Sequence, residues 1–389
     1  MRILRSIGTV NSVHGGPIEG IKQVARIHSL AGHETEIVCL DSPDDAWVKE
    51  FPLKVHALGP GLFSYDYTRK FVPWLAERRK EYDAVIVSGL WRYSGFGVWR
   101  ALRGTDAPYF VFPHGMLDPW FKRAYPFKHL KKWLYWPWAD YRMLRDARAV
   151  LFTSEEECRA ARESFWLYRC NEVVVNYGIA APTGDAEAQK QAVLGRFPEL
   201  AGKRAFVFLS RIHEKKGCDL LVRAFAKIAR TDDSLRLVFA GPDQTGWVAA
   251  LGALAVQLGI ADRIVWTGMI SGDLKWGMLH LAEAFVLPSH QENFGLAVAE
   301  ALACGTPVLI SNKVNIWREI EAERAGLVDE DDEPGTLRLL EKWLALSPDE
   351  KDAMRRTARQ TFQARFEVTH AAEALIEVIR RHSKPAGKR

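Results

Sequence analysis

The stretch of residues 286–311 constrains the possible fold more than any other part of the chain. It reads VLPSHQENFGLAVAEALACGTPVLIS. An apolar strand leads into the polar loop SHQEN, and a helix is predicted to open at Phe294-Gly295 and to run to about Cys304. The tripeptide G-T-P then breaks the helix before a second apolar strand, Val308–Ile310. Strand, loop, helix and strand in this order predict a parallel βαβ unit.

Two carboxylates stand in this unit, eight positions apart. Glu292 lies in the predicted loop and Glu300 inside the predicted helix. Both can therefore border one cleft at the carboxyl edge of the sheet, where α/β proteins bind ligands. The backbone amides of Asn293, Phe294 and Gly295 are expected to be the first donors of the helix, so they can bind anions or hydroxyls. The alternative is an ordinary amphipathic helix with two solvated glutamates.

A second pair of charged residues follows another predicted strand. The segment R-I-H-E-K-K-G begins at Arg211, just after the strand Ala205–Leu209, and places Lys216 five residues further on. Two cations beside the N-terminus of a helix can clamp a diphosphate. The alternative is two solvated surface cations.

The two carboxylates belong to a longer pattern. The E-x7-E spacing of Glu292 and Glu300 overlaps F-G-L-x-x-x-E-A-x-A-x-G-x-P-V, which runs from Phe294 to Val308. This pattern resembles the retaining glycosyltransferases of family 4, the glycosyl transferases group 1. The R-x-x-x-x-K-G pattern of Arg211 and Lys216 also fits that family. The resemblance implies the GT-B fold, an α/β architecture of two Rossmann-like domains whose parallel sheets face a central cleft.

The resemblance implies a role for each of these residues. Glu292 would hold hydroxyls of the donor sugar, and Glu300 the ribose hydroxyls of the nucleotide. Arg211 and Lys216 would stabilise the negative charge that develops on the leaving diphosphate. The acceptor would attack from the leaving-group face, with the departing phosphate oxygen taking its proton. Because the two cations replace a metal ion and no D-x-D stands at a strand end, we expect a reaction without metal or cofactor.

The order of strands and helices predicts two domains. Strands and helices alternate in the first half, lose their period near residues 181–204, and alternate again afterwards. The family resemblance is strong over about residues 205–330 and looser over residues 1–180. The predicted parts are an N-terminal Rossmann-like domain on the acceptor side (1–180), an interdomain link (181–204), a nucleotide-sugar domain (205–365), and a C-terminal helix that returns to the first domain, with a tail (366–389).

Two candidate sites lie in the first half of the chain. Gly15 and Gly16 follow the first strand and allow close approach of a ligand to the backbone, although the G-x-G-x-x-G of dinucleotide-binding proteins is absent. The resemblance places this loop beside the donor diphosphate, and a plain turn is the alternative. His114 follows the strand Tyr109–Phe112. The resemblance places it in the catalytic cleft near the 6-position of the sugar, whereas a lone histidine is otherwise more often structural.

One further segment, at the end of a predicted strand, is a candidate edge for the nucleobase. Its backbone would border the base because it follows the strand next to the predicted clamp. The segment consists of Thr267, Gly268, Met269 and Ile270.

Residues 120–138 alternate basic and aromatic side chains and contain no acidic residue. Tryptophan and tyrosine favour the headgroup layer of a bilayer, and lysine is attracted to anionic lipid. The segment therefore predicts a peripheral contact with an anionic membrane on the acceptor side. The alternative is that its aromatic residues pack in the domain core or an oligomer interface. The residues expected to form the membrane surface are Lys128, Lys131, Lys132, Trp133 and Trp136.

Composition places limits on the partners and the compartment. A net charge of +5 over 389 residues is too mild to indicate nucleic acid. The five cysteines are scattered and form no C-x-x-C pair, which is typical of reduced thiols. We find no signal peptide and no apolar run of 18 residues, so a cytoplasmic protein is expected, and the inner face of the cell membrane is the location that a peripheral contact would imply.

The sequence thus predicts an enzyme, a retaining hexosyltransferase that needs no metal. The expected donor is a UDP- or GDP-sugar, and the expected acceptor is a glycan or a polyprenyl-diphosphate-linked molecule. Such a reaction belongs to the biosynthesis of cell-surface polysaccharide, for example lipopolysaccharide or exopolysaccharide. One alternative is a nucleotide-sugar 2-epimerase of the same fold, which needs additional cleft acids that we do not find. The other is a non-catalytic sugar-nucleotide-binding protein, which the loss of Glu292 or of the clamp cations would favour.

Overall fold

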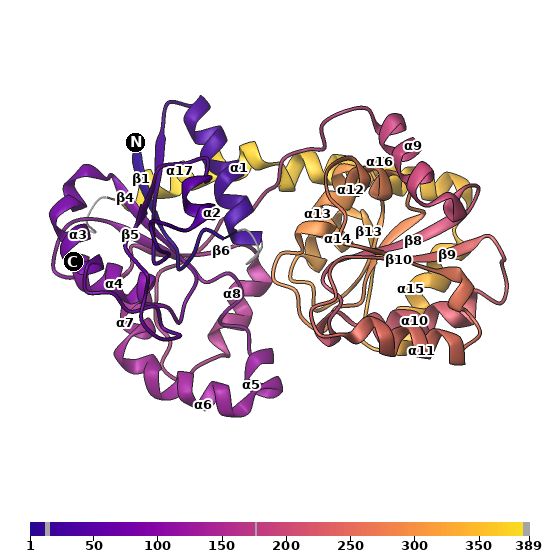
Figure 1. Ribbon diagram of the computed structural model, residues 1–389, viewed down its shortest axis with the longest axis horizontal. Coiled ribbons are helices and arrows are strands. Elements are labelled where there is room, and N and C mark those ends of the chain that lie inside the picture. The colour runs from indigo at the N-terminus through magenta and orange to yellow at the C-terminus, as the bar shows by residue number, and fades with distance from the viewer. Residues whose placement is uncertain (12–15, 176, 384–389) are drawn as a thin grey trace. The chain divides into compact units, whose positions relative to one another are not determined.

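A computed structural model describes residues 1–11, 16–175 and 177–383 of the protein (Figure 1). The chain divides into two compact units. The first consists of residues 1–178 and 368–389, and the second of residues 179–367. Each unit is an α/β structure built on its own parallel sheet.

The described residues of the first unit form a seven-stranded parallel sheet with the order β3-β2-β1-β4-β5-β6-β7. Every residue of β4, β5 and β6 is buried, so these strands read as continuous apolar runs, as expected for a sheet covered on both faces. The short edge strand β3 was not predicted, because its three residues are only half-buried and carry little apolar signal. The strands are β1 (Arg2–Ser6), β2 (Glu34–Cys39), β3 (Val55–Ala57), β4 (Ala84–Ser88), β5 (Tyr109–Phe112), β6 (Ala149–Phe152) and β7 (Glu172–Val174).

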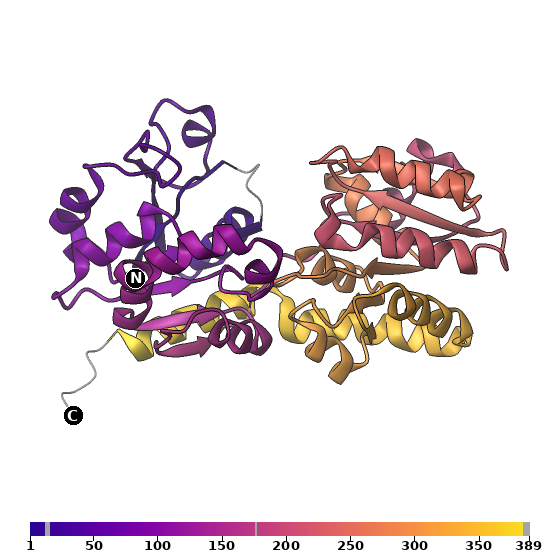
Figure 2. The ribbon, with the colours of Figure 1, turned by 90° about the horizontal axis from the view of Figure 1, so that it is seen from below.

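Helices connect these strands, and the last helix of the chain also belongs to this unit. Helix α17 packs against α1, where the His28 ring nitrogen Nε2 lies 3.1 Å from the carbonyl oxygen of Ala372. The yellow helix α17 lies along the first unit in both views (Figure 1 and Figure 2). The helices are α1 (Gly16–Leu30), α2 (Ala46–Lys49), α3 (Phe71–Arg78), α4 (Tyr93–Leu102), α5 (Trp120–Ala124), α6 (Pro126–Tyr135), α7 (Asp140–Asp146), α8 (Glu155–Arg162) and α17 (Val368–His382).

Residues 179–367, all of which the structure describes, contain a six-stranded parallel sheet with the order β10-β9-β8-β11-β12-β13. In both units the chain first builds one side of the sheet and then returns to build the other, which is the Rossmann order. The point of reversal lies between β1 and β4 in the first sheet and between β8 and β11 in the second. The strands are β8 (Arg204–Leu209), β9 (Leu235–Ala240), β10 (Ile264–Gly268), β11 (Ala284–Leu287), β12 (Val308–Ser311) and β13 (Gly326–Asp329).

Helices cover both faces of the second sheet. Figure 1 shows α10, α11 and α15 on one face and α9, α12 and α16 on the other. The helices are α9 (Ala186–Arg196), α10 (Cys218–Ile228), α11 (Trp247–Gln257), α12 (Gly272–Leu281), α13 (Leu296–Ala303), α14 (Trp317–Glu323), α15 (Glu333–Ala345) and α16 (Pro348–Thr361).

The segment 181–204, predicted to be an interdomain link, is part of the second unit instead. Its helix α9 packs closely on α12, because a Cβ atom at Gly277 would lie only 2.1 Å from the carbonyl oxygen of Gln189. Gln189 and Val193 are buried four residues apart on one face of α9. A buried glutamine weakens the apolar period, which explains why the sequence pattern did not reveal this face.

The basic-aromatic segment 120–138 forms α5, α6 and a short turn of 3₁₀-helix. No residue of α6 is buried, although several of its side chains are large and apolar. Trp136 differs, because it is fully buried and its indole N–H donates to the carbonyl oxygen of Leu167 at 2.5 Å. The prediction that Trp136 belongs to an exposed membrane surface is therefore wrong, since it fills the core of the first unit.

Candidate active site

Two charged side chains meet at the point of reversal in the second sheet. Lys216 follows β8 and Glu292 follows β11, the two strands on either side of that point. The Lys216 Nζ donates to Glu292 Oε2 in a short ion pair. Lys216 is only 3% exposed, which is rare for a lysine and requires a partner of opposite charge.

Backbone hydrogen bonds hold the Glu292 loop in place. The Glu292 N–H donates to the carbonyl oxygen of Lys313 at 2.9 Å, and the Asn315 N–H donates to the carbonyl oxygen of Glu292 at 3.0 Å. On its other side, the His290 N–H donates to the carbonyl oxygen of Lys215 at 2.9 Å. The loop after β11 is thus tied to the loops after both neighbouring strands, β8 and β12.

The Glu292 carboxylate is held in its ionised form. Burial is the largest single influence and would raise its pKa, but Lys216, Lys215 and the Asn293 N–H together outweigh burial, and the pKa lies below the usual value of a glutamate. The backbone N–H of Asn293 also donates to Glu292 Oε1 at 3.0 Å. The site therefore presents a fixed carboxylate and a fixed ammonium side by side.

The predicted helix start is displaced. Helix α13 begins at Leu296 rather than at Phe294, because Gly295 adopts a left-handed conformation with a φ of 77°. The Asn293 amide binds the Glu292 side chain, and Phe294 is a 5% exposed ring packed edge-on against Phe366 at 5.7 Å. The sequence had predicted that the amides of Asn293 and Phe294 would be the first donors of the helix. Because the helix begins at Leu296, they are not.

Glu300 lies in α13 and forms a second ion pair. Its Oε1 accepts a hydrogen bond from Lys275 Nζ in α12 at 2.8 Å. The Lys275 ammonium also lies 4.0 Å from the centroid of the Trp276 ring. Lys275 was not predicted, because it stands in none of the sequence motifs and only the packing of α12 near α13 brings it to Glu300.

Arg211 and Lys216 stand on one loop but bind different partners. The Arg211 side chain is exposed, and its Nη1 donates to Gln244 Oε1 at 3.1 Å. Lys216 bonds to Glu292. The structure thus brings Lys216 to the Glu292 carboxylate, whereas Arg211 faces the loop after β9.

The segment predicted to edge the nucleobase lies at an irregular strand end. The register of β10 shifts between Trp266 and Gly268, and the Thr267 hydroxyl donates to the carbonyl oxygen of Gly268 at 2.8 Å. Met269 is 78% exposed. Ile270 instead packs against the small core around Val193. The four residues therefore do not share one environment.

His114 occupies a strained position just after β5. Its φ of 50° is unusual for a residue with a side chain, and its ring stacks on Phe112 with a centroid distance of 5.4 Å. Burial, together with the nearby Arg5 guanidinium, lowers the pKa of His114 to about 3. The ring is thus neutral at pH 7, and its buried Nε2 has no hydrogen-bond partner among the described residues.

Gly16 is the first residue of α1, and Gly15 lies outside the described residues.

Arg5 is a site residue that sequence reasoning missed. It lies within strand β1, is 6% exposed, and its guanidinium carbon lies 5.6 Å from the centroid of the Phe112 ring. Burial lowers the pKa of Arg5 to about 10, which is still above 7, so the side chain is a cation at pH 7. An arginine inside an apolar strand was the available signal in the sequence.

The remaining predicted residues lie around α6. Lys128 and Lys131 are exposed, and Trp133 is 42% exposed. Lys132 is half-buried, with its ammonium 4.6 Å from the centroid of the Trp91 ring. Among the described residues, no helix has the length and apolar character needed to cross a bilayer, and no cluster of His, Cys, Asp and Glu could hold a metal ion.

Solved structures with the same architecture cover nearly all of the chain. A sucrose-phosphate synthase of Thermosynechococcus elongatus aligns with a TM-score of 0.77 at 20% identity over 98% of both chains. HepE of Anabaena, solved in complex with UDP, aligns with a TM-score of 0.79 at 15% identity over 98% of this chain and 100% of its own. At these identities the likeness shows the fold alone.

Sequence relatives match parts of the chain. A D-inositol 3-phosphate glycosyltransferase of Saccharomonospora viridis is 33% identical over 184 residues, which are 44% of this chain and 42% of the relative. The enzyme of the same name from Nocardia farcinica is 30% identical over 248 residues, 61% of this chain and 53% of its own length. The chain therefore matches about half of the length of these curated relatives.

Two family models together cover most of the chain. The model described as glycosyl transferase 4-like domain matches residues 15–178, within the first unit. The model described as glycosyl transferases group 1 matches residues 195–361, within the second unit, and includes Lys216, Glu292 and Glu300. The chain belongs to the glycosyl transferases group 1 and has the GT-B fold.

Proposed function

We propose that the protein transfers a sugar from a nucleoside-diphosphate sugar to an acceptor with retention of the anomeric configuration. The observation that carries this proposal is the ion pair of buried Lys216 with half-buried Glu292 at the point of reversal of the second sheet. That point is where doubly wound sheets bind nucleotide ligands. A carboxylate and an ammonium held there offer one group for sugar hydroxyls and one for phosphate oxygens.

Charge development on the leaving group explains the role of the lysine. When the anomeric C–O bond breaks, both electrons stay with the diphosphate oxygen, and the sugar ring gains positive character. The ammonium of Lys216 has three N–H donors, so it can keep its bond to Glu292 and still donate to a phosphate oxygen. Arg211 would close on the same diphosphate from the other end of the loop. Such contacts accelerate the reaction because they strengthen as the charge grows.

The same chemistry supports a reaction without metal or cofactor. The two cations would neutralise the diphosphate. A D-x-D, Asp329 and Asp331, does stand at the end of β13. Both carboxylates are already engaged by protein side chains, Asp329 by Arg338 and Lys342 and Asp331 by His290. Neutral His114 would hydrogen-bond to a sugar hydroxyl, for which its buried Nε2 is available. Glu300, held by Lys275, would accept hydrogen bonds from the ribose hydroxyls.

UDP-sugars are the donors that the comparisons support, and lipid-linked glycans are the acceptors that the surface supports. HepE was solved in complex with UDP and with UDP-glucose. A second protein of the same fold, WaaG, is described as involved in lipopolysaccharide biosynthesis. Helix α6 exposes lysines and large apolar side chains, which suits a cytoplasmic enzyme that works on polysaccharide precursors at an anionic membrane.

Thermal unfolding in the presence of nucleotides tests the donor. UDP and UDP-glucose should raise the melting temperature of the purified protein, because a ligand that binds only the native state stabilises it by about 2.7 kcal/mol at a hundred times its Kd. GDP and GDP-mannose serve as matched controls for the base. A melting temperature that no nucleoside diphosphate or nucleotide sugar shifts would contradict the proposal.

A further inference from the structure

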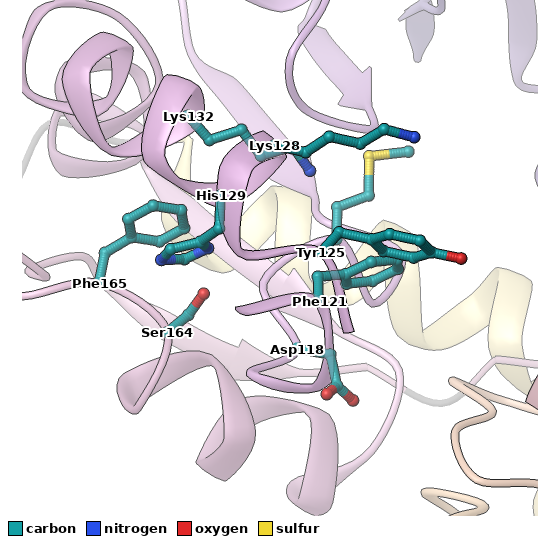
Figure 3. A pocket seen from close by; sticks show the side chains of 9 residues that line it. Asp118, Phe121, Tyr125, Lys128, His129, Lys132, Ser164 and Phe165 are labelled. Atoms are coloured by element: carbon teal, nitrogen blue, oxygen red, sulfur yellow. The ribbon is translucent and has the colours of Figure 1, made fainter. Parts of the chain in front are cut away.

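Two cavities flank helix α6 in the first unit. The smaller has a volume of about 200 Å³ and lies between α6 and the loop that follows β5 (Figure 3). The larger has a volume of about 790 Å³ and lies on the side of α6 that carries Leu130 and Trp133. Both are lined by His129, Ser164 and Phe165, so the two cavities share one wall.

The smaller cavity carries a concentration of positive charge. Lys128 and Lys132, one helical turn apart on α6, both line it. Each ammonium lies against an aromatic ring, Lys128 at 5.0 Å from the centroid of Tyr125 and Lys132 at 4.6 Å from that of Trp91. No carboxylate of the described residues lies within ion-pair distance of either ammonium. Burial and the neighbouring Lys128 lower the pKa of Lys132, against the opposing effect of buried Asp140. An anion in this cavity would relieve the repulsion between the lysines.

One acidic residue also lines the smaller cavity. Asp118 Oδ1 accepts a hydrogen bond from the backbone N–H of Trp120 at 2.8 Å. In Figure 3, Asp118 lies at the side of the cavity opposite the two lysines. The rings of Phe121 and Tyr125 lie between them. The cavity is therefore positive on the α6 side, where an anion would bind.

The shared wall is a stacked pair of rings. His129 stacks on Phe165 with a centroid distance of 4.8 Å and an interplanar angle of 21°. Burial, with Lys122 and Lys132 nearby, lowers the pKa of His129, so its ring is a neutral hydrogen-bonding group at pH 7. The Ser164 hydroxyl stands beside it in Figure 3. These two side chains offer N–H and O–H donors to a ligand that also touches the lysines.

The larger cavity is apolar where it faces away from this wall. Leu130, Trp133 and Trp166 line it, and they are 55%, 42% and 64% exposed. The two indole rings pack against each other with their centroids 5.9 Å apart, so together they form one apolar part of the cavity wall. The volume of this cavity, about 790 Å³, is within the range of ligand pockets.

We propose that the two cavities form one site for a single-chain lipid phosphate, with the phosphate beside Lys128 and Lys132 and the hydrocarbon chain along Leu130, Trp133 and Trp166. The adjacent positive and apolar cavities match a molecule with a phosphate at one end and a hydrocarbon chain at the other. This inference rests on the proposed function, because the lipid phosphate would be the carrier of the acceptor glycan. It adds the place on the first domain where that carrier binds.

Isothermal titration of the full chain with farnesyl phosphate, below the concentration at which it forms micelles, tests the site. Farnesol and inorganic phosphate separate the contributions of chain and headgroup, and each should bind at least tenfold more weakly than farnesyl phosphate. K128Q/K132Q should raise the Kd of farnesyl phosphate by about tenfold or more, because each lost lysine removes a charge-assisted hydrogen bond. Leu130→Glu, at an exposed position, should also raise this Kd, because it places a carboxylate beside the hydrocarbon chain of the ligand.

Lys131 provides the matched control. It is exposed on the same helix and lines neither cavity, so Lys131→Gln should leave the Kd of farnesyl phosphate unchanged. The inference is overturned if inorganic phosphate binds as tightly as farnesyl phosphate, or if K128Q/K132Q, with an unchanged melting temperature, binds as wild type does. UDP binding, measured in parallel, tests the proposed function separately, since the lipid phosphate is titrated without a nucleotide.

Discussion

The ammonium of buried Lys216 and the carboxylate of half-buried Glu292 form an ion pair between the ends of two neighbouring strands, β8 and β11. The pair couples the stability of the second domain to its chemistry. Removing one partner of a buried pair leaves the other charge without compensation and typically costs about 3–5 kcal/mol. Single substitutions here will therefore change both folding and turnover, and the two effects need to be separated.

A double-mutant cycle separates them. Glu292→Gln should abolish transfer while leaving nucleotide binding nearly intact, because the carboxylate is proposed to hold the sugar. Lys216→Met should reduce turnover by roughly 100-fold, more than it weakens substrate binding, and should destabilise the protein through the unpaired Glu292. The double variant should regain stability but not activity. The measurements are kcat, KM and urea unfolding for all four proteins, and wild-type turnover in Glu292→Gln would show that the site is assigned wrongly.

Glu300→Ala should act on the nucleotide rather than on the sugar. If the carboxylate accepts hydrogen bonds from the ribose hydroxyls, its loss should raise the Kd of UDP by about tenfold, as expected for a charge-assisted hydrogen bond. Lys275→Gln is the informative partner, because it removes the ion pair and keeps the carboxylate. It should weaken UDP less than Glu300→Ala does. Equal UDP affinity in wild type and Glu300→Ala, measured by titration calorimetry, would exclude this role.

The sequence predicted those parts of the site that follow strands. Most strands could be recognised because a sheet covered on both faces needs continuous apolar runs, and the carboxyl ends of parallel strands meet at one edge. Glu292 and Lys216 could be placed in this way. Lys275 could not, because it reaches Glu300 through the packing of two helices, and such packing leaves no local pattern in the sequence.

The sequence pattern also failed to predict burial where neighbouring residues of one segment lie partly in the core and partly at the surface. Trp136 is in the core, whereas Trp133, three residues earlier, is 42% exposed. The alternation of basic and aromatic residues gives no period that separates the two. Similarly, the helix was predicted to open at Phe294-Gly295, but the left-handed backbone of Gly295 ends the preceding loop and delays the helix to Leu296.

Activity should not depend on a divalent metal ion. The proposed neutralisation of the leaving diphosphate relies on the side chains of Lys216 and Arg211 in place of a metal ion. Turnover with the identified donor should therefore survive excess EDTA. The control is an added excess of magnesium or manganese, which should not raise the rate. Loss of activity with EDTA, followed by recovery with either ion, would contradict the proposed role of the two cations.

Asp140 should make the protein less stable as the pH rises. Its side chain is fully buried, and burial raises its pKa to about 7, against the opposing effects of the Trp91 N–H and Lys132. Between the unfolded value of 3.8 and about 7, the folded state binds more protons, so the free energy of unfolding falls as the pH rises. Asp140→Asn removes this titration. The difference in unfolding free energy between wild type and variant should change by up to roughly 4 kcal/mol from pH 4 to pH 8, and parallel pH profiles in urea unfolding would contradict it.

Binding to anionic vesicles should depend on the exposed face of α6. Lys128 and Lys131 on α6 are exposed, as is Lys122 on the neighbouring helix α5, and each contributes about 1 kcal/mol near an anionic surface. The apolar side chains beside them are also available for insertion, since Phe127 is 84% exposed and Leu134 is 62% exposed. In co-sedimentation, the bound fraction should rise with anionic lipid and fall with salt. It should drop when lysines are replaced by glutamate in K128E/K131E/K132E.

The same change of charge at exposed lysines elsewhere in the first domain, K49E/K70E/K80E, should reduce binding much less. Wild-type protein that stays in the supernatant with anionic vesicles at low salt would show that the face of α6 does not bind membranes.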